Sequence, residues 1–397
     1  MSEKMDKLVK LGSDVVMNTY TRYPVALEYG DGCYMWDIDG KKYLDFVGGI
    51  AVNSLGSNYD KIVDKISEQA KKLIHCSNLY YTEPQIQLAN MLVKNSDFDK
   101  VFFCNSGAEA NESALKLCRK YAELKNKKGN DIITMVKSFH GRTYGAVTAT
   151  GQDKYHKGLG PLLPGIKYAE YNNIDSLKEA IDENTCAIML EVIQGEGGII
   201  PADKEYLKEV RKICDDNDIV LIFDEVQTGV GRCGELFAYQ LYGVAPDIVT
   251  LAKGLAGGVP IGAMLATDKV AVAFNPGDHA STFGGNPLAT SVGTVVINEI
   301  INNGILENVK KQGEYLTTKL NELMEKHSII KSVRGFGLMQ GLQTTVPTGK
   351  IVKKCIENGL LVVGAGNDVI RFVPPLIVSQ KEIDEAVAII DKVLSDI

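Results

Sequence analysis

The amino-acid sequence predicts an α/β fold with a large domain, whose mostly parallel sheet is flanked by helices, and a smaller α+β domain. Three apolar runs, Cys186–Leu190, Ile219–Phe223 and Ile248–Ala252, recur at intervals of roughly 30 residues, the length of one strand–helix–strand unit. Apolar runs of this length are typical of buried parallel strands. After Pro287 the pattern changes to long amphipathic helices separated by short strand-like pieces, which indicates a second, smaller unit.

The first predicted strands lie near the N-terminus, in residues 33–46. Apolar and polar residues alternate there on both sides of Asp39-Gly40, a dipeptide that favours a tight hairpin turn. We expect this N-terminal segment to pack with the smaller domain. The expected division of the chain is therefore an N-terminal segment (1–49), a large domain (50–286) and a C-terminal small domain (287–397).

Strand and helix patterns alternate through the large domain and reappear, shorter, in the small one. In the large domain the further predicted elements are strands at Val101–Cys104, Asp131–Val136 and Ile261–Ala266 and a helix at Ala108–Tyr121. In the small domain they are helices at Leu306–Glu325 and Gln380–Leu394 and strands at Leu338–Gln343 and Val369–Val373.

Composition excludes several classes of function. The chain has 397 residues and a formal net charge of −7, which argues against nucleic acid or an anionic membrane as its main partner. No apolar run approaches the ~18 residues of a membrane helix. The eight cysteines are scattered without a Cys-x-x-Cys pair, so we expect free thiols in a reducing cytoplasm and no metal site.

The residues that follow the three apolar runs are Glu191, Asp224 and Lys253. Right-handed crossovers place the carboxyl ends of parallel strands at one edge of the sheet, where ligands of α/β proteins bind. Lys253 stands among apolar and glycine residues, and desolvation lowers the pKa of an ammonium group, as covalent catalysis by lysine requires. Taken singly, each residue also has a structural explanation: a helix N-cap for Asp224, a loop contact for Glu191 and an ion pair for Lys253.

Two glycine-containing segments have the composition of phosphate-binding turns. Ser106-Gly107-Ala108 lies between a predicted strand and a predicted helix, so its backbone N–H groups can bind a phosphate, although taken alone the segment is better explained by an ordinary serine N-cap. The segment Gly229–Gly234 matches G-x-G-x-x-G but begins five residues after its strand, and no acid follows at the required distance. We therefore do not expect a dinucleotide site.

Three further residues are candidates for ligand contacts. Phe139 and Arg142 follow a predicted strand, where an aromatic face can cover a planar ring and a guanidinium can bind a carboxylate. Arg371 lies between Ile370 and Phe372, and an arginine in such an apolar stretch needs an anionic partner, either a fixed acid or a bound ligand.

Together these motifs resemble the class III, fold-type-I, pyridoxal-phosphate-dependent aminotransferases. The resemblance extends from Tyr34-Met-Trp-Asp to Arg371-Phe-Val-Pro-Pro. It is carried, in order, by Asn105-Ser-Gly-Ala-Glu-Ala-Asn-Glu, Phe139-His-Gly-Arg, Glu191-Val-Ile-Gln-Gly-Glu-Gly-Gly, Asp224-Glu-Val-Gln-Thr-Gly, Leu251-Ala-Lys-Gly and Ser281-Thr-Phe-Gly-Gly-Asn-Pro.

The resemblance implies pyridoxal 5'-phosphate as cofactor and assigns residues to it. Lys253 would hold the cofactor covalently and then act as acid and base, and Asp224 would pair with the ring nitrogen. The remaining implied cofactor-binding residues are Gln227 at the ring hydroxyl, Phe139 on the ring, Ser106, Gly107 and Ala108 at the phosphate, and Glu191. Thr282 would reach the phosphate of a neighbouring subunit, which implies a homodimer.

The resemblance also implies substrate contacts and a reaction. Arg371 would bind the α-carboxylate of glutamate, Glu196 would pair with Arg371 when the other substrate is bound, Arg142 would hold the remaining carboxylate, and Tyr20 is a further substrate-binding candidate. Within the family the sequence is most similar to the acetylornithine branch, which converts N-acetylornithine and 2-oxoglutarate to N-acetylglutamate 5-semialdehyde and glutamate. The alternatives are another ω-aminotransferase of the class, acting on ornithine, succinylornithine, succinyl-diaminopimelate or 4-aminobutyrate, and an aminomutase.

Overall fold

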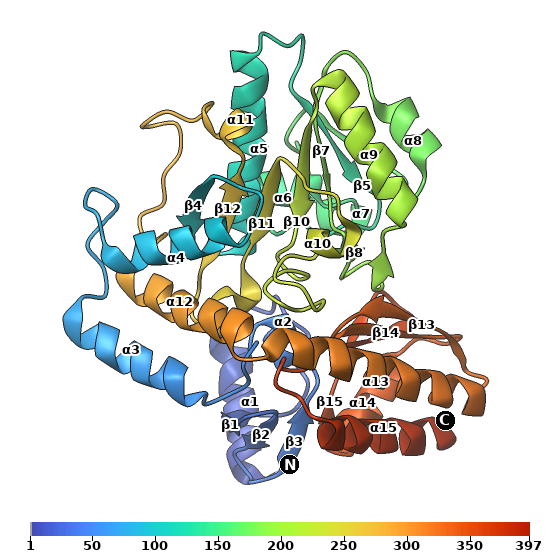
Figure 1. Ribbon diagram of the computed structural model, residues 1–397. Coiled ribbons are helices and arrows are strands. Elements are labelled where there is room, and N and C mark those ends of the chain that lie inside the picture. The colour runs from blue at the N-terminus through green and yellow to red at the C-terminus, as the bar shows by residue number, and fades with distance from the viewer. Residues whose placement is uncertain (1) are drawn as a thin grey trace.

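A seven-stranded sheet forms the centre of the computed structural model, which describes residues 2–397 (Figure 1). In spatial order the strands are β4 (Lys100–Cys104), β12 (Gly262–Ala266), β11 (Ile248–Leu251), β10 (Val220–Asp224), β7 (Thr185–Leu190), β5 (Asp131–Met135) and β6 (Ile166–Ala169). The neighbouring strands β11, β10, β7, β5 and β6 run parallel to one another. Only β12 runs antiparallel to its neighbours. The predicted α/β class with a mostly parallel sheet is confirmed.

Both faces of this sheet are covered, which explains why its strands are apolar throughout. Alternate residues of β10 point to opposite faces. Leu221 and Phe223 belong to one buried cluster, and Val220 and Ile222 belong to another. The elements that connect or cover the strands are α5 (Gly107–Leu124), α6 (Tyr144–Ala149), α7 (Asp153–His156), α8 (Ile174–Ala180), α9 (Lys204–Asn217), α10 (Tyr239–Tyr242), α11 (Asp268–Ala271) and the 3-10 helix η1 (Lys253–Ala256).

A separate antiparallel sheet lies in the C-terminal part of the chain (Figure 1). Its strands, in spatial order, are β13 (Ile330–Phe336), β14 (Met339–Thr344), β17 (Val369–Phe372) and β16 (Val363–Ala365). The helices α13 (Ile305–Lys326), α14 (Gly349–Glu357) and α15 (Gln380–Ser395) accompany it. Arg371 pairs with Gly341 in the middle of this sheet, which fixes the backbone from which its side chain projects.

The N-terminal strands join the C-terminal part of the chain. The predicted hairpin around Asp39-Gly40 is confirmed, because β2 (Tyr34–Asp37) and β3 (Lys42–Asp45) pair antiparallel. This sheet also contains β1 (Leu27–Asp31) and β15 (Leu360–Leu361), which pairs with β3. The expected division of the chain at residues 49/50 and 286/287 stays a prediction.

The remaining elements are mostly helical. They are α1 (Glu3–Val15), α2 (Gly48–Ala51), α3 (Asp60–Lys72), α4 (Glu83–Lys94), α12 (Pro287–Asn302) and the short pair β8 (Ile193–Gln194) and β9 (Ile200–Pro201). Helix α12 packs against α3 and α4 (Figure 1). Gly229–Gly234 lies in turns between β10 and α10 and forms no strand-to-helix turn. Across residues 2–397, no helix is long and apolar enough to cross a membrane.

Candidate active site

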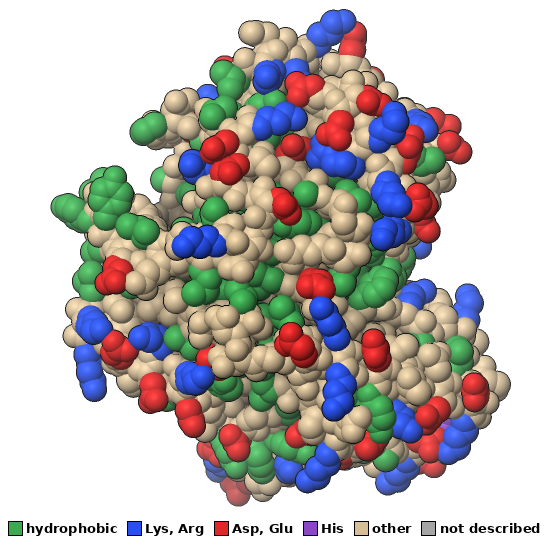
Figure 2. Space-filling view, in the orientation of Figure 1, with side chains coloured by type: hydrophobic (Ala, Val, Ile, Leu, Met, Phe, Trp, Pro, Cys, Tyr) green, Lys and Arg blue, Asp and Glu red, His purple; other side chains and the backbone are tan. Residues whose placement is uncertain are grey.

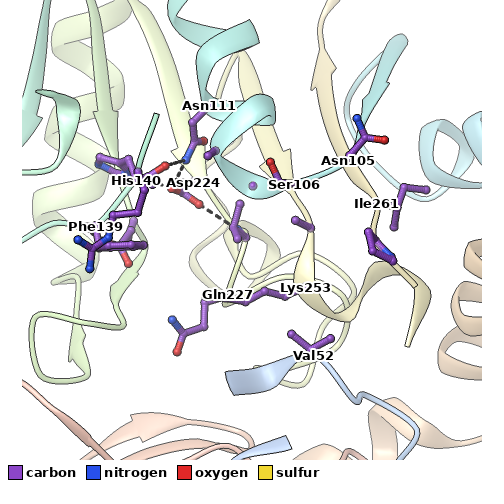
Figure 3. Close-up of a pocket in the computed structure, with 18 of the residues that line it drawn as sticks. Val52, Asn105, Ser106, Asn111, Phe139, His140, Asp224, Gln227, Lys253 and Ile261 are labelled. Carbon is purple, nitrogen blue, oxygen red and sulfur yellow. Dashed lines mark hydrogen bonds and ion pairs between the residues drawn. The ribbon is translucent and has the colours of Figure 1, made fainter. Parts of the chain in front are cut away.

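The ends of three neighbouring parallel strands converge on one cavity of about 450 Å³ (Figure 3). Glu191 follows β7, Asp224 ends β10 and Lys253 follows β11, and all three line the cavity. The convergence predicted from the spacing of the apolar runs is therefore confirmed. The other lining residues are Val52, Asn105, Ser106, Gly107, Ala108, Asn111, Phe139, His140, Gly141, Arg142, Val226, Gln227, Ala252, Gly258, Val259, Pro260 and Ile261.

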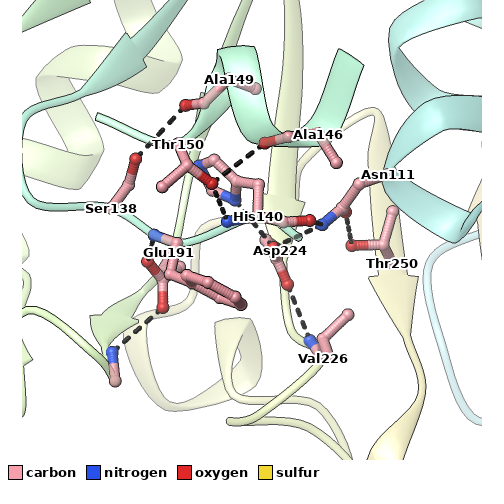
Figure 4. Close-up of polar contacts among 12 residues, drawn as sticks. Asn111, Ser138, His140, Ala146, Ala149, Thr150, Glu191, Asp224, Val226 and Thr250 are labelled. Atoms are coloured by element: carbon pink, nitrogen blue, oxygen red, sulfur yellow. Dashed lines mark hydrogen bonds and ion pairs between the residues drawn. The ribbon is translucent and has the colours of Figure 1, made fainter. Parts of the chain in front are cut away.

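The Asp224 carboxylate is buried and fully engaged by polar partners (Figure 4). Its Oδ2 accepts a hydrogen bond from Asn111 Nδ2 at 2.8 Å and lies 2.8 Å from Nδ1 of His140. Its Oδ1 accepts from the backbone N–H of Val226 at 3.0 Å. Thr250 extends the network by donating to Oδ1 of Asn111 at 2.7 Å. These contacts fix the position of the carboxylate and stabilise its charge.

Sequence reasoning did not single out Asn111, Thr250 or the ring of His140 as partners of Asp224. Asn111 is separated from Asp224 by 113 residues and His140 by 84, so no local pattern joins them. The sequence could have indicated Asn111, because it follows Gly107 by about one helical turn and therefore lies on the same side of α5 as the glycine.

Glu191 shapes the cavity through the backbone. Its two carboxylate oxygens accept hydrogen bonds from the N–H groups of Phe139 at 2.9 Å and Gly195 at 3.0 Å. Burial raises the pKa of Glu191 to about 7. The residue thus connects the segment that carries Phe139 to the segment that leads to Glu196.

Lys253 occupies a strained position at the end of its strand. Its φ is +41°, in the left-handed region that residues other than glycine rarely adopt, and such strain is concentrated at functional sites. Burial lowers the pKa of its ammonium group. A lysine with these properties carries a neutral, nucleophilic amine at a lower pH than a solvated lysine does.

The N-terminus of helix α5 forms another wall of the cavity. Ser106 is its N-cap and accepts a hydrogen bond from the N–H of Glu109 at 3.2 Å, so the structural interpretation of this serine is correct. Gly107 and Ala108 also line the cavity. A Cβ at Gly107 would come within 2.7 Å of the Val226 side chain, so glycine is required for this close approach. The dipole of an 18-residue helix favours an anion at this end.

Phe139 and Arg142 meet at one side of the cavity. The guanidinium of Arg142 lies 4.0 Å from the ring centre of Tyr155 and 5.5 Å from that of Phe139. Phe139 and Tyr155 contact each other edge to face, with ring centres 5.7 Å apart. Arg142 is exposed, so its guanidinium is available to a ligand at the rim of the cavity.

Arg371 is almost completely buried and has a fixed anionic partner. Its Nη1 donates to Oε1 of Glu196 at 2.5 Å and to Oε1 of Gln227 at 3.0 Å. Burial alone would raise the pKa of Glu196, but the charge and hydrogen bond of Arg371, together with the charges of Lys253 and Lys154, outweigh it and hold that pKa below its ordinary value. The pairing of Glu196 with Arg371 that the resemblance implies is present, and Gln227 connects the pair to the cavity around Lys253.

Two candidate residues lie outside this cavity. Tyr20 is 70% exposed and stacks under the guanidinium of Arg22, 5.4 Å from its ring centre. Thr282 is exposed. Neither side chain lines the cavity within one chain, and their roles stay predictions.

Comparison with known proteins identifies the family. The family profile described as "Aminotransferase class-III" matches residues 15–394. The chain belongs to the class III aminotransferases. It is 59% identical to the acetylornithine aminotransferase of Caldanaerobacter subterraneus subsp. tengcongensis, an alignment that covers 96% of this chain and 98% of the relative. It is 51% identical to the acetylornithine aminotransferase of Methanocaldococcus jannaschii, with 96% of each chain covered.

Solved structures of class III aminotransferases share the whole fold. The N-acetylornithine aminotransferase of Stenotrophomonas maltophilia superposes with a TM-score of 0.85 at 38% identity, covering 98% of both chains. The ornithine aminotransferase of Toxoplasma gondii superposes with a TM-score of 0.96 at 31% identity, covering 100% of this chain and 96% of that one. The fold-type-I architecture implied by the sequence is therefore confirmed.

The cofactor of class III aminotransferases is pyridoxal 5'-phosphate, and the residues around the cavity fit it. The cavity offers an amine of lowered pKa on Lys253, a buried carboxylate on Asp224 and the N-terminus of α5 for a phosphate. Its volume lies in the usual range for small-molecule sites, roughly 300–1,000 Å³.

Proposed function

We propose that this aminotransferase moves the terminal amino group of N-acetylornithine to 2-oxoglutarate, giving N-acetylglutamate 5-semialdehyde and glutamate in arginine biosynthesis. The observation that carries the proposal is the buried pair of Arg371 and Glu196 beside the Lys253 cavity. A free arginine suits glutamate, whose reacting carbon bears a carboxylate. A neutralised arginine suits a terminal amine, whose reacting carbon bears none. The names of the relatives at 59% and 51% identity support the same reaction.

Lys253 and Asp224 perform the chemical work in this proposal. Bound pyridoxal phosphate supplies an aldehyde for amines and a ring that withdraws electrons from the substrate carbon. Lys253 would hold the cofactor through its amine and would act as the acid and base that moves a proton at the amine-bearing carbon of the substrate. The anionic carboxylate of Asp224 holds a proton on the ring nitrogen. His140 and Asn111 keep that carboxylate in place.

Other residues of the cavity position the cofactor. Ser106 and the N–H groups of Gly107 and Ala108 bind its phosphate at the positive end of α5. Phe139 covers one face of the ring, and the hydrogen bond from its N–H to Glu191 fixes the backbone at that point. Since Oε1 of Gln227 accepts from Arg371, the amide nitrogen of Gln227 is the group that can donate to the ring hydroxyl oxygen.

The substrates are distinguished by two arginines. Arg371 binds the α-carboxylate of glutamate after Glu196 moves away, and Glu196 neutralises Arg371 when N-acetylornithine is bound. Arg142, exposed at the cavity rim, binds the carboxylate far from the reacting carbon. Tyr20 is proposed to contact the substrate of a neighbouring subunit, because it lies outside the cavity of its own chain.

The chain is further proposed to act as a homodimer, in which Thr282 serves the cofactor phosphate of the partner. Large apolar side chains are strongly exposed in the chain, and Figure 2 shows such side chains projecting beside the connection between α3 and α4. They include Tyr81 at 95%, Met17 at 84%, Leu79 at 83%, Tyr80 at 67% and Phe283 at 62%. Apolar patches of this kind mark interaction surfaces, and a symmetric dimer would bury them.

We also propose that the protein works in the cytoplasm. Its eight cysteines are all free, and seven of them are buried. Free thiols persist in a reducing compartment, where disulfides are rare. The acidic net charge of −7 suits a protein whose partners are small molecules.

A panel of amino donors tests the proposed reaction. The holoenzyme is supplied with 2-oxoglutarate and with N-acetylornithine, ornithine, succinylornithine, succinyl-diaminopimelate or 4-aminobutyrate, and glutamate formation is measured. The proposal expects the highest kcat/KM for N-acetylornithine. A higher value for another donor would assign the chain to that branch of the class, and turnover without any amino acceptor would indicate an aminomutase.

A further inference from the structure

A second cavity, of about 760 Å³, lies between the large sheet and the C-terminal sheet. Residues 137, 152, 154 and 196–197 contribute one side, and residues 331, 344–347 and 366–368 contribute the other. Glu196 is in its wall, and the same carboxylate pairs with Arg371, which contacts Gln227 in the wall of the first cavity. The ion pair of Glu196 and Arg371 therefore lies between the second cavity and the wall of the first.

Three lysines face this second cavity and none has an acidic partner. Lys137 follows β5, Lys154 lies in α7 and Lys331 lies in β13. Across residues 2–397, no carboxylate lies within 4.0 Å of any of the three ammonium groups. Other lysines of the same chain do form ion pairs, such as Lys128 with Glu183 and Lys326 with Asp391.

The acids of the second cavity do not neutralise these lysines. Glu196 is already paired with Arg371. Asp368 accepts a hydrogen bond from Nε2 of Gln343 at 2.8 Å and is a single charge against three. Because Arg371 balances the charge of Glu196, three lysines face one remaining carboxylate, and this excess of positive charge attracts anionic ligands.

We propose that the cavity lined by Lys137, Lys154 and Lys331 is a recruiting site for dicarboxylates, which it delivers to Arg371. This inference rests on the proposed function, which supplies 2-oxoglutarate and glutamate as substrates. At neutral pH 2-oxoglutarate carries two negative charges, whereas N-acetylornithine has one carboxylate and one ammonium and no net charge. The lysines therefore raise the local concentration of the keto acid and leave that of the amine unchanged.

The recruiting site also supports the exchange of partners at Arg371. An arriving carboxylate must replace Glu196, whose displaced charge then needs a cationic environment. Glu196 shares the second cavity with the three lysines, and the positive charge of Lys154 already contributes to holding the pKa of Glu196 below its ordinary value. The lysines thus lower the free energy needed to separate Glu196 from Arg371 when a dicarboxylate is present.

The test is a triple variant, Lys137→Gln, Lys154→Gln and Lys331→Gln. The matched control is Lys311→Gln, Lys353→Gln and Lys381→Gln, which removes the same charge from exposed positions on α13, α14 and α15. At low ionic strength we expect kcat/KM for 2-oxoglutarate to fall by about tenfold or more in the cavity variant only, and the difference to shrink as salt is added. For N-acetylornithine we expect a change of less than about twofold.

A binding measurement separates this inference from the proposed reaction. Glutarate, an unreactive five-carbon dicarboxylate, is titrated into the holoenzyme by calorimetry, so that no amino donor is needed. We expect its Kd to rise by about tenfold in the cavity variant and to stay unchanged in the control. Equal glutarate affinities in the two variants would overturn the recruiting site even if transamination of N-acetylornithine is confirmed. A selective loss of glutarate affinity would support the site even if another amine proves to be the donor.

Discussion

Nδ1 of His140 lies 2.8 Å from Oδ2 of Asp224, and both side chains are almost entirely buried. The histidine belongs to the segment that also carries Phe139 and Arg142, so one short stretch of chain positions the acid, the aromatic face and the substrate arginine. Asn111 reaches the same oxygen from helix α5. Asp224 is therefore oriented from two directions before any ligand arrives, which is the preorganisation that electrostatic catalysis requires.

Removing the histidine tests whether this orientation matters. We expect His140→Leu to lower kcat/KM by about 10- to 100-fold, because a hydrogen bond to a charged group contributes about 1.5–3 kcal/mol. His140→Asn, which can still donate, should retain more activity. Thr250→Val is the control, since it removes a contact of Asn111 and leaves all three partners of Asp224 in place. A shift of the pH profile of kcat/KM in His140→Leu distinguishes positioning of Asp224 from a general loss of structure. If kcat/KM and its pH profile are both unchanged, His140 does not position Asp224.

The pair of Glu196 and Arg371 predicts a change of substrate preference. In Glu196→Ala, Arg371 is left free, which favours glutamate and other α-amino acids over terminal amines. We expect the ratio of kcat/KM for glutamate to that for N-acetylornithine to rise by about tenfold or more, equivalent to about 1.4 kcal/mol. Single-turnover spectroscopy with each donor measures the ratio. An unchanged ratio would eliminate the switch at Arg371 and leave the aminotransferase assignment intact.

Buried Glu225 predicts a pH dependence of stability. Its carboxylate oxygens accept from the N–H groups of Ala238 and Tyr239, and burial raises its pKa to about 8. In the unfolded chain a glutamate titrates near pH 4, so between these values the native state binds the extra proton and stability falls as the pH rises. The loss is on the order of 4–5 kcal/mol across the whole interval.

The measurement is urea unfolding of wild type and Glu225→Gln at several pH values from 5 to 8. The variant should show a flatter dependence of the free energy of unfolding on pH, whatever its absolute stability. Glu235→Gln, at a surface ion pair with Lys310, is the control and should keep the wild-type slope. Identical slopes in all three proteins would show that Glu225 does not bind the extra proton.

The exposed apolar surface predicts that a charge there disrupts the dimer. Tyr81→Asp should shift the protein towards monomers and weaken cofactor binding, because Thr282 then no longer reaches the partner's phosphate. Leu124→Asp, at an exposed leucine on the end of α5, is the control and should leave assembly unchanged. Sedimentation of each protein with and without cofactor gives the result. A wild-type monomer with full activity would refute the dimer.

The three polar residues at the strand ends could be predicted because each follows its apolar run directly in the sequence. Glu191, Asp224 and Lys253 each follow an apolar run directly, and strand topology then brings them together. The support around them is not local. Thr250 contacts Asn111 across 139 residues and Glu196 contacts Arg371 across 175, so only the folded chain reveals these distances. The family resemblance implied the second contact, but composition and spacing did not.

The roles predicted for Tyr20 and Thr282 stay predictions. Both side chains are exposed and lie outside the cavity of their own chain. The three lysines of the second cavity carried no motif at all, because they come from β13, α7 and the end of β5 and have nothing in common along the chain. Their grouping follows from packing of the two sheets.

Chemical labelling of Lys253 tests most directly whether this lysine holds the cofactor. The holoenzyme is reduced with borohydride, digested and analysed by mass spectrometry, and the loading of apoenzyme with pyridoxal phosphate is followed as a function of pH. Since burial lowers the pKa of Lys253, loading should proceed well below the pH at which a solvated lysine loses its proton. We expect one pyridoxyl group per chain, on Lys253, and none in Lys253→Ala; a label on another residue of cofactor-saturated protein would show that Lys253 does not hold the cofactor.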